Sequence, residues 1–415
     1  MAGALLGAAV IGGCANPRTP GEALSPAPAR IVEEAATLTT PAGEIFGTLE
    51  FPAARLPVPV VLIIAGSGPT DRNGNSIALP GANNSLKMLA DGLAARGIAS
   101  LRYDKRGIGA SRAAMTKEDD LRFEHFIDDA TGWVNKLRQD PRFSTVTVAG
   151  HSEGSLIGMV AARTGRADAY VSLEGAGRKP PDVIAEQLSA QLPPAIVAQA
   201  MEAMKKIEAG EKPDSFPPML MALFRPSVQP YLTSWFAVSP VEEIAKLDVP
   251  VRIVQGTTDL QVTGQDSKNL AAAKTNAKVV VIEGMNHVLK SASGPIGEQM
   301  KSYTDSTIVV VPGLIDEIAG FVKGLNRVKH SAFGIDKLKH FLFAGYVESV
   351  GFAGLQTAGA GRNVAFAGAT AGTIAFSIGK EIHDRRTYGL FSLADLVWDA
   401  LGVGAALLIL VRTPQ

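Results

Sequence analysis

Several residue types are scarce in this 415-residue chain, and each shortage excludes a class of protein. A single cysteine excludes an internal disulfide, and no cysteine–histidine cluster indicates a zinc site. The 40 Lys and Arg residues balance 40 Asp and Glu residues without a basic run, so nucleic acid is not an expected partner. The length exceeds the usual size of a single domain, so at least two units are expected. The composition, 46% hydrophobic and only 19% charged, suits a globular body with a large core plus a more apolar part.

A serine bracketed by glycines stands in the segment Gly150-His-Ser-Glu-Gly154. The β-rich run 144–149 precedes this segment, and the helical pattern 155–162 follows it. A G-x-S-x-G motif between a strand and a helix predicts a sharp turn that strains the serine backbone and lifts its hydroxyl above the sheet. Gly150 and Gly154 are required because side chains there would collide with the neighbouring strand and helix. We therefore predict that Ser152 is a nucleophile.

Two further residues complete a catalytic set in chain order. Asp259 follows the apolar strand pattern 249–254, and His287 follows the next pattern, 278–283. Reactive groups of open parallel sheets lie just beyond the carboxyl ends of strands, which is where both residues stand. A histidine can take the serine proton, and a carboxylate can hold the imidazole tautomer and stabilise the imidazolium. The order Ser152, Asp259, His287 is that of α/β-hydrolases and differs from the chymotrypsin and subtilisin orders.

Simpler interpretations of these residues stay open at this point. Asp259 could be an ordinary loop residue or a helix N-cap. His125 falls within a segment of helical periodicity, which favours a surface or packing role. His151 occupies a variable position of the serine turn. We expect His287 to be the base because it is the one histidine of six that follows a strand downstream of a candidate acid.

A glycine-rich loop could supply the remaining element of this chemistry. The apolar strand pattern 56–64 runs directly into a loop that contains Gly66, Ser67 and Gly68. Glycines allow backbone N–H groups to turn toward a developing alkoxide, where each preorganised donor contributes about 3–4 kcal/mol. We expect the two donors to be the amides of Glu153 and Ser67. The alternative is a turn-rich loop without a catalytic role.

Longer segments resemble a known family. Segments 66–75, 101–111, 150–154 and 255–259 are similar to those of a bacterial esterase branch of the α/β-hydrolase superfamily, grouped with the serine aminopeptidase and dienelactone hydrolase families. The resemblance covers roughly residues 35–325. It implies that Asp104 and Arg106 brace the sheet edge beside the active site and are not catalytic. The branch usually carries Asp where Asn73 stands, which changes the charge of the loop but leaves its backbone role.

The order of the predicted elements indicates the fold class. Strand and helix patterns alternate after a β-hairpin at 31–51, which predicts a mostly parallel sheet with helices on both faces. Residues 31–327 form this predicted α/β-hydrolase domain, and a helical insertion at about 178–246 resembles the lid of the family. Helices separated by prolines are expected in the insertion at 181–192, 194–209 and 217–223. The apolar residues of the insertion either line an acyl pocket or only pack the lid onto the body. They are Met219, Leu220, Met221, Leu223, Phe224, Tyr231, Leu232, Trp235 and Phe236.

Residues 1–30 resemble a lipoprotein signal and tether. Residues 1–13 are small and apolar, Cys14 follows them, and residues 15–29 are rich in Pro, Ala and Gly. This pattern predicts cleavage before Cys14 and attachment of lipid to its sulfur. Because the apolar stretch is short and no Lys or Arg precedes it, the alternatives are an uncleaved apolar tail or a start further upstream.

Residues 328–415 form a second predicted unit, an apolar helical module rich in Gly and Ala. Its three apolar stretches lie at 341–355, 364–378 and 393–411. None is a clean membrane span, because each is short or carries Glu348, Asp395 or Asp399. Segments 336–341, 379–384 and 391–402 resemble YfiM-like lipoproteins of bacterial envelopes and VanZ-like membrane proteins. No activity accompanies this resemblance.

Four polar residues of this module could meet in one cluster: His340, Glu381, Asp384 and Asp395. Such a cluster would bind a metal or a lipid headgroup. The simpler alternative is that these residues pair with one another as buried ions and hydrogen-bond partners.

These patterns together predict a serine hydrolase that cleaves carboxylic esters through an acyl-enzyme intermediate, with no metal or organic cofactor. The expected substrates are small or lipid-like acyl esters. The expected location is the periplasmic side of the bacterial cell envelope, with the protein anchored to the membrane. The alternatives are a serine aminopeptidase or thioesterase with the same triad, and a non-catalytic envelope binding or assembly protein.

Overall fold

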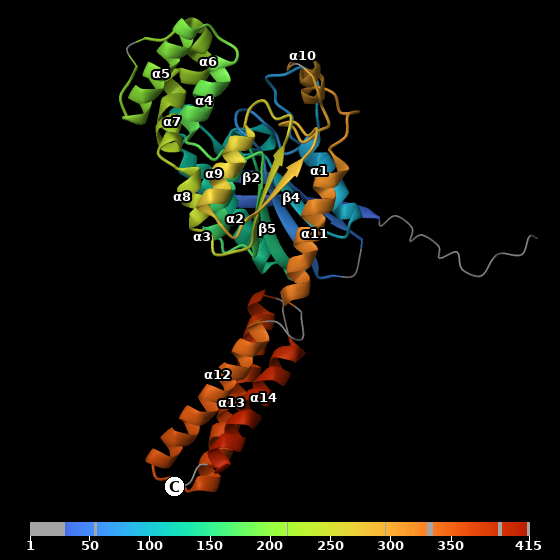
Figure 1. Ribbon diagram of the computed structural model, residues 1–415, viewed down its shortest axis with the longest axis vertical. Coiled ribbons are helices and arrows are strands. Elements are labelled where there is room, and N and C mark those ends of the chain that lie inside the picture. The colour runs from blue at the N-terminus through green and yellow to red at the C-terminus, as the bar shows by residue number, and fades with distance from the viewer. Residues whose placement is uncertain are drawn as a thin grey trace, which may run out of the picture.

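The computed structural model describes residues 30–53, 56–213, 215–294, 296–329, 335–388 and 392–412. The predicted signal and tether, including Cys14, lie outside the described residues. Two units follow one another along the described chain: a body built on one sheet, and a helical bundle that begins at Ile335 (Figure 1).

One eight-stranded sheet organises the body, with the strand order β1-β2-β4-β3-β5-β6-β7-β8. The strands are β1 (Ile31–Thr40), β2 (Gly43–Pro52), β3 (Val58–Ile64), β4 (Ala99–Tyr103), β5 (Phe143–His151), β6 (Ala169–Leu173), β7 (Val251–Gly256) and β8 (Lys278–Ile282). β1 and β2 form the predicted antiparallel hairpin, and β2 also pairs antiparallel with β4. The remaining neighbours in the sheet pair in parallel. This mostly parallel sheet with an antiparallel edge confirms the predicted α/β-hydrolase fold.

Helices cover both faces of the sheet (Figure 1). On one face lie α1 (Ser85–Ala95) and α11 (Pro312–Lys329), and on the other lie α2 (Phe123–Gln139), α3 (Glu153–Thr164), α8 (Pro240–Ala245) and α9 (Gly264–Ala273). Every residue of β3 is buried between these layers. Leu62 of β3 belongs to the core that contains Trp133 of α2, whereas Ile63 belongs to the core that contains Leu93 of α1. Alternation of side chains along one strand therefore supplies two apolar cores.

The insertion between β6 and β7 is helical, as predicted. Its helices are α4 (Pro180–Ser189), α5 (Pro194–Glu208), α6 (Met221–Phe224) and α7 (Gln229–Phe236). α7 is not among the predicted helices. Its Pro230 stands in the first turn, where a missing N–H costs no helical hydrogen bond, so this proline starts a helix instead of separating two.

Three long helices form the C-terminal bundle: α12 (Ile335–Thr357), α13 (Arg362–Tyr388) and α14 (Leu393–Arg412). α12 packs against both of the others, and the bundle extends away from the sheet with the C-terminus at its far end (Figure 1). Each predicted apolar stretch lies inside one of these helices, which continue through polar residues beyond it. Among the described residues, α14 is the one helix long and apolar enough to cross a membrane.

Candidate active site

Ser152 occupies a strained turn between β5 and α3. Its backbone has φ 55° and ψ −121°, a conformation that costs a non-glycine residue about 1–3 kcal/mol. A Cβ on Gly150 would lie 2.1 Å from the carbonyl oxygen of Gly154, and a Cβ on Gly154 would lie 2.5 Å from that of Ile64. Both contacts involve backbone atoms that cannot move aside, so both positions need glycine. The chain therefore forms a sharp elbow with Ser152 at its tip.

The structure brings Ser152, Asp259 and His287 together from the ends of three strands. His287 Nε2 lies 3.1 Å from Ser152 Oγ, and His287 Nδ1 lies 2.7 Å from Asp259 Oδ2. Asp259 Oδ1 accepts hydrogen bonds from the backbone amides of Gln261 and Val262, at 2.7 and 3.0 Å. With Nδ1 donating to the carboxylate, Nε2 is the nitrogen free to accept the serine proton.

A second carboxyl group, Glu174, lies beside Asp259 and is not among the predicted site residues. It follows β6 with φ 48° and is completely buried. Glu174 Oε1 accepts a hydrogen bond from the Gly256 amide at 2.7 Å, and Oε2 accepts one from Gln255 Nε2 at 2.6 Å. Its place directly after a buried strand is the same sequence signal that points to Asp259.

Burial, together with the charge of Asp259, raises the pKa of Glu174 well above its ordinary value. The protonated form of Glu174 is thereby favoured, and in that form it can donate a hydrogen bond to Asp259. Although burial opposes ionisation of Asp259, the charge of His287 and its hydrogen bonds, including the one with Glu174, hold the pKa of Asp259 below its ordinary value. The pKa values of the two adjacent acids are thus shifted in opposite directions, which favours the negative charge on Asp259.

The two predicted oxyanion donors border one space above the serine. Glu153 begins α3, so its amide has no acceptor within the helix. A Cβ on Gly66 would lie 3.2 Å from Ser152 Cβ, so the loop after β3 passes close to the serine. Ser67 and Gly68 of this loop line the same cavity as Ser152 and Glu153. Backbone amides at these positions can reach an alkoxide that forms next to the serine.

Lys105 joins the two segments that carry these amides, and it too is absent from the predicted site. Its side chain is buried, and its Nζ donates to the Gly66 carbonyl at 2.7 Å and to Glu153 Oε2 at 3.0 Å. The Phe126 ring centre lies 4.9 Å from the same ammonium. A charge pair that touches both segments fixes the spacing between them.

The family resemblance implies that Asp104 and Arg106 brace the sheet edge, and both side chains make contacts that can do so. Asp104 accepts hydrogen bonds from the Arg72 amide at 2.8 Å and from the Arg72 guanidinium at 2.7 Å, which ties the loop after β3 to the loop after β4. Arg106 forms a two-pronged pair with Asp129 of α2, at 2.6 and 2.8 Å. Such planar pairs hold two elements in a defined orientation.

Two other histidines have structural roles. His151 Nε2 donates to the carbonyl oxygen of His287 at 2.6 Å. Burial, together with the nearby His287, lowers the pKa of His151 to about 4, so this ring is neutral at pH 7. His151 therefore supports the backbone of His287. The sequence, in which His151 is only a variable position of the serine turn, does not predict this role. His125 accepts the Arg122 amide in the first turn of α2.

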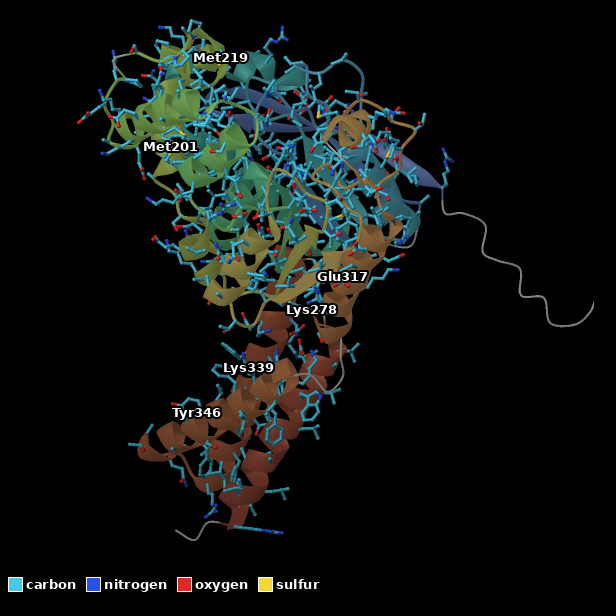
Figure 2. All side chains as sticks on the ribbon, turned by 45° about the horizontal axis from the view of Figure 1, so that its top comes forward. Met201, Met219, Lys278, Glu317, Lys339 and Tyr346 are labelled. Atoms are coloured by element: carbon cyan, nitrogen blue, oxygen red, sulfur yellow. The ribbon has the colours of Figure 1, made fainter. Side chains whose placement is uncertain are left out.

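A cavity of about 410 Å³ lies above Ser152, between the body and the lid. Some of the apolar lid residues line a pocket and others only pack the lid, so each of the two interpretations holds for part of the set. Leu223, Tyr231, Leu232 and Trp235 line the cavity, Leu220, Phe224 and Phe236 are buried, and Met219 and Met221 are exposed. Figure 2 shows Met219 on the outer surface of the lid.

The charged groups that line the cavity already have partners. Arg178 binds Asp266 at 2.7 and 2.9 Å, and Arg225 pairs with Glu118. Glu153 is the one acid among the described lining residues, and the buried ammonium of the body holds its carboxylate. The cavity therefore offers a substrate a largely apolar surface without an unpaired charge.

Comparisons with known proteins concern the body. The family model described as Serine aminopeptidase, S33 matches residues 82–209, a range that contains Ser152 and ends before Asp259 and His287. Esterase EstD from Thermotoga maritima is 27% identical over 281 residues, which cover 66% of this chain and 64% of that protein. The chain thus spans just under two thirds of the length of this curated relative.

Solved structures of similar arrangement have low sequence identity. Est1E from Butyrivibrio proteoclasticus is 16% identical with a TM-score of 0.45, covering 70% of this chain and 98% of that one. The alpha/beta hydrolase GrgF from Penicillium is 19% identical with a TM-score of 0.47, covering 73% of this chain and 100% of that one.

Proposed function

We propose that this protein is a serine hydrolase that cleaves carboxylic esters through an acyl-enzyme intermediate. The observation that carries the proposal is the hydrogen-bonded chain from Ser152 through His287 to Asp259, with the serine on a strained elbow beneath a cavity. The similarity to a protein named as an esterase supports the same chemistry.

The reaction follows from the positions of these atoms. Ser152 Oγ attacks the acyl carbonyl while His287 Nε2 takes its proton, and Asp259 stabilises the resulting imidazolium. The amides of Glu153 and Ser67 hold the oxyanion. His287 then returns the proton to the departing alcohol, and a water molecule, activated by the same nitrogen, releases the acid from the acyl-enzyme. Each step uses groups of the chain, substrate and water.

The cavity favours an ester over an N-terminal peptide as the substrate. An aminopeptidase must bind a protonated α-amino group, which calls for an available carboxylate near the nucleophile. Among the described residues that line the cavity, the one carboxylate belongs to Glu153, and Lys105 already neutralises it. An uncharged acyl group fits this apolar surface better, whether it comes from a small ester or from a lipid.

The bundle supports a location at a membrane. Many of its large apolar side chains face outward, among them Tyr346, Leu408 and Ile409, which are 66%, 65% and 68% exposed. Figure 2 shows Tyr346 on the outer surface of the bundle. Hydrocarbon would cover these side chains without the cost that water imposes. Lipidation of Cys14 and a periplasmic position in the bacterial envelope belong to the same proposal.

The test is hydrolysis of p-nitrophenyl esters with short, medium and long acyl chains by the full chain. Ser152→Ala should reduce kcat by about 10⁴-fold or more. Ser189→Ala, which removes an exposed hydroxyl bonded only to the Ala185 carbonyl within α4, should leave kcat unchanged. A fluorophosphonate should label the wild type at Ser152. Equal turnover by Ser152→Ala and wild type, or a wild type that neither turns over esters nor accepts the label, would refute the proposal.

A further inference from the structure

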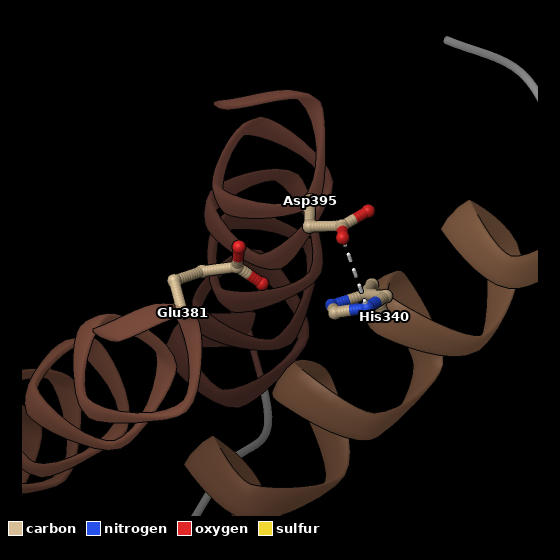
Figure 3. A group of neighbouring side chains, drawn as sticks. All are labelled: His340, Glu381 and Asp395. Carbon is tan, nitrogen blue, oxygen red and sulfur yellow. Dashed lines mark ion pairs between the residues drawn. The ribbon is translucent and has the colours of Figure 1, made fainter. Parts of the chain in front are cut away.

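The three helices of the bundle bring His340, Glu381 and Asp395 together (Figure 3). One ligand atom from each, a histidine nitrogen or a carboxylate oxygen, lies within 4.8 Å of the other two. The Glu381 side chain is 2% exposed, and those of His340 and Asp395 are 16% and 13% exposed. The side chain of Asp384, predicted to join this cluster, lies outside the described part of the chain.

His340 is oriented like a metal ligand. Its Nδ1 lies 2.9 Å from Asp399 Oδ1, and in the tautomer that donates there, Nε2 is the ring nitrogen available to a metal and faces Asp395 Oδ2. The distance from Nε2 to Oδ2 is 3.6 Å, too long for a good hydrogen bond. Two ligands of one tetrahedral ion with bonds of about 2.0–2.1 Å lie about 3.3–3.4 Å apart, so a small movement would fit an ion between them. A carboxylate on the second ring nitrogen is the usual support of a ligating histidine.

The two carboxylates are also held from behind. Asp395 Oδ1 pairs with the buried Lys337, which leaves Oδ2 directed at His340. Glu381 Oε2 accepts a hydrogen bond from the Ser392 amide at 2.8 Å, and its Oε1 lies 3.4 Å from Lys380 Nζ, a longer contact that an ion could replace. The shorter contact of each acid fixes one oxygen and so restricts the direction of the other.

The charge of the cluster favours a cation. Among the described residues of the cluster, the carboxylates of Glu381, Asp395 and Asp399 outnumber the ammonium groups of Lys337 and Lys380 by three to two. A divalent ion would balance the remaining negative charge in this buried setting. A cavity of about 410 Å³, which His340 and Asp399 line together with apolar side chains of α12 and α13, adjoins the cluster.

A second acidic group shows what such a cluster looks like when protein cations already satisfy it. Glu33, Glu50 and Asp91 of the body also lie within 4.8 Å of one another. Arg102 pairs with Glu33 and Glu50, and Lys87 pairs with Glu33 and Asp91. This group has no histidine, and an arginine or a lysine pairs with each of its three carboxylates, so it serves as an internal control.

We propose that His340 Nε2, Glu381 and Asp395 bind one divalent transition-metal ion of the Zn²⁺ type, which joins α12, α13 and α14. One nitrogen and two carboxylate oxygens suit Zn²⁺ and its neighbours in the first transition series better than Mg²⁺ or Ca²⁺. The ion's role is to hold three helices at one level of the bundle. This proposal does not depend on the activity of the body.

The test uses the full chain in detergent, stripped with EDTA and dialysed, then titrated with Zn²⁺ by calorimetry. One equivalent should bind, and Co²⁺ should give a visible ligand-field spectrum. His340→Ala and Asp395→Asn should each weaken Zn²⁺ binding at least tenfold and abolish the Co²⁺ spectrum, whereas Asp399→Asn should weaken binding about tenfold by releasing the His340 ring.

Two control variants separate this site from adventitious binding. Glu33→Gln removes an acid from the satisfied cluster, and His125→Ala removes a histidine from α2; both should bind Zn²⁺ like the wild type. If a bundle variant does not fold, the wild-type titration alone still decides. Absence of saturable binding of Zn²⁺ by the stripped wild type, or binding that survives His340→Ala in folded protein, would overturn the proposal and leave the cluster as an ion-pair network.

Discussion

In the body, apolar side chains fill two cores on either side of the sheet, whereas in the bundle many of the largest apolar side chains lie outside. Phe343, Phe376 and Leu401 are more than half exposed, while Lys337 and Glu381 are buried among the helices. The body also buries charged side chains, among them the ion pairs of Lys105 with Glu153 and of Arg102 with Glu50. The difference is the basis of the proposal that the bundle, unlike the body, packs its apolar surface against a membrane.

The largest effect is expected from a variant that removes the catalytic activity of the body and leaves the bundle unchanged. Asp259→Asn keeps the shape of the side chain but removes the charge and favours the wrong His287 tautomer. We expect kcat for a soluble ester to fall about 10⁴-fold, with vesicle binding unchanged. Steady-state kinetics and vesicle flotation measure the two properties separately. A loss below tenfold would mean that Asp259 is not the acid of the site.

The second prediction concerns a variant that weakens the membrane affinity of the bundle and leaves the body unchanged. Leu401→Lys places a charge near the middle of α14, on an exposed position. A lysine at the centre of a membrane helix costs about 3 kcal/mol, so the partition of the protein into phospholipid vesicles should fall roughly a hundredfold. The matched control is Val281→Lys on β8, which is also exposed but belongs to the body. Equal losses for both variants would contradict the comparison, as would none for Leu401→Lys.

The third prediction concerns a buried charge of the body. Lys105→Met removes the ammonium from Glu153 and the Gly66 carbonyl, so a buried carboxylate is left unpaired at a cost of about 3–5 kcal/mol. We expect a lower melting temperature and a kcat about tenfold lower, because the oxyanion amides lose their spacing. The double variant Lys105→Met with Glu153→Gln should recover most of the stability. If it does not, the charge pair is not the reason for the loss.

The smallest expected effect sharpens the contrast between the two adjacent acids of the site. Because burial raises the pKa of Glu174 above its ordinary value of 4.5, the folded protein keeps a proton that the unfolded chain releases. The stability that Glu174 contributes is therefore complete below about pH 4.5 and is lost as the pH rises through its raised pKa. Glu174→Gln cannot ionise, so its free energy of unfolding should lack this decline. Urea unfolding from acid to neutral pH tests it, and parallel pH profiles would count against a neutral Glu174.

Local patterns were sufficient for most of the fold and for the serine elbow. The hairpin, the parallel strands and a helical insertion are confirmed, because each depends on hydrophobic alternation and turn residues within a short segment. α7 is missing from the prediction because a proline can begin a helix as well as end one. Lys105 is missing because nothing near it in the sequence reveals that it touches Gly66. Glu174 stands at a strand end, as Asp259 does, but that position alone does not reveal its contact with Gly256.

By itself, the sequence determined which residues could perform the chemistry and in what order they follow the strands, because residue type and strand patterning are local properties. Only the tertiary structure decided which of them meet. Glu174 and Gly256 are 82 residues apart, and Lys105 and Gly66 are 39 apart, so their hydrogen bonds exist only once the sheet has formed. The same holds for the bundle: its composition predicts apolar helices, but the packing of three helices alone sets which charges turn inward and which apolar faces are left outside.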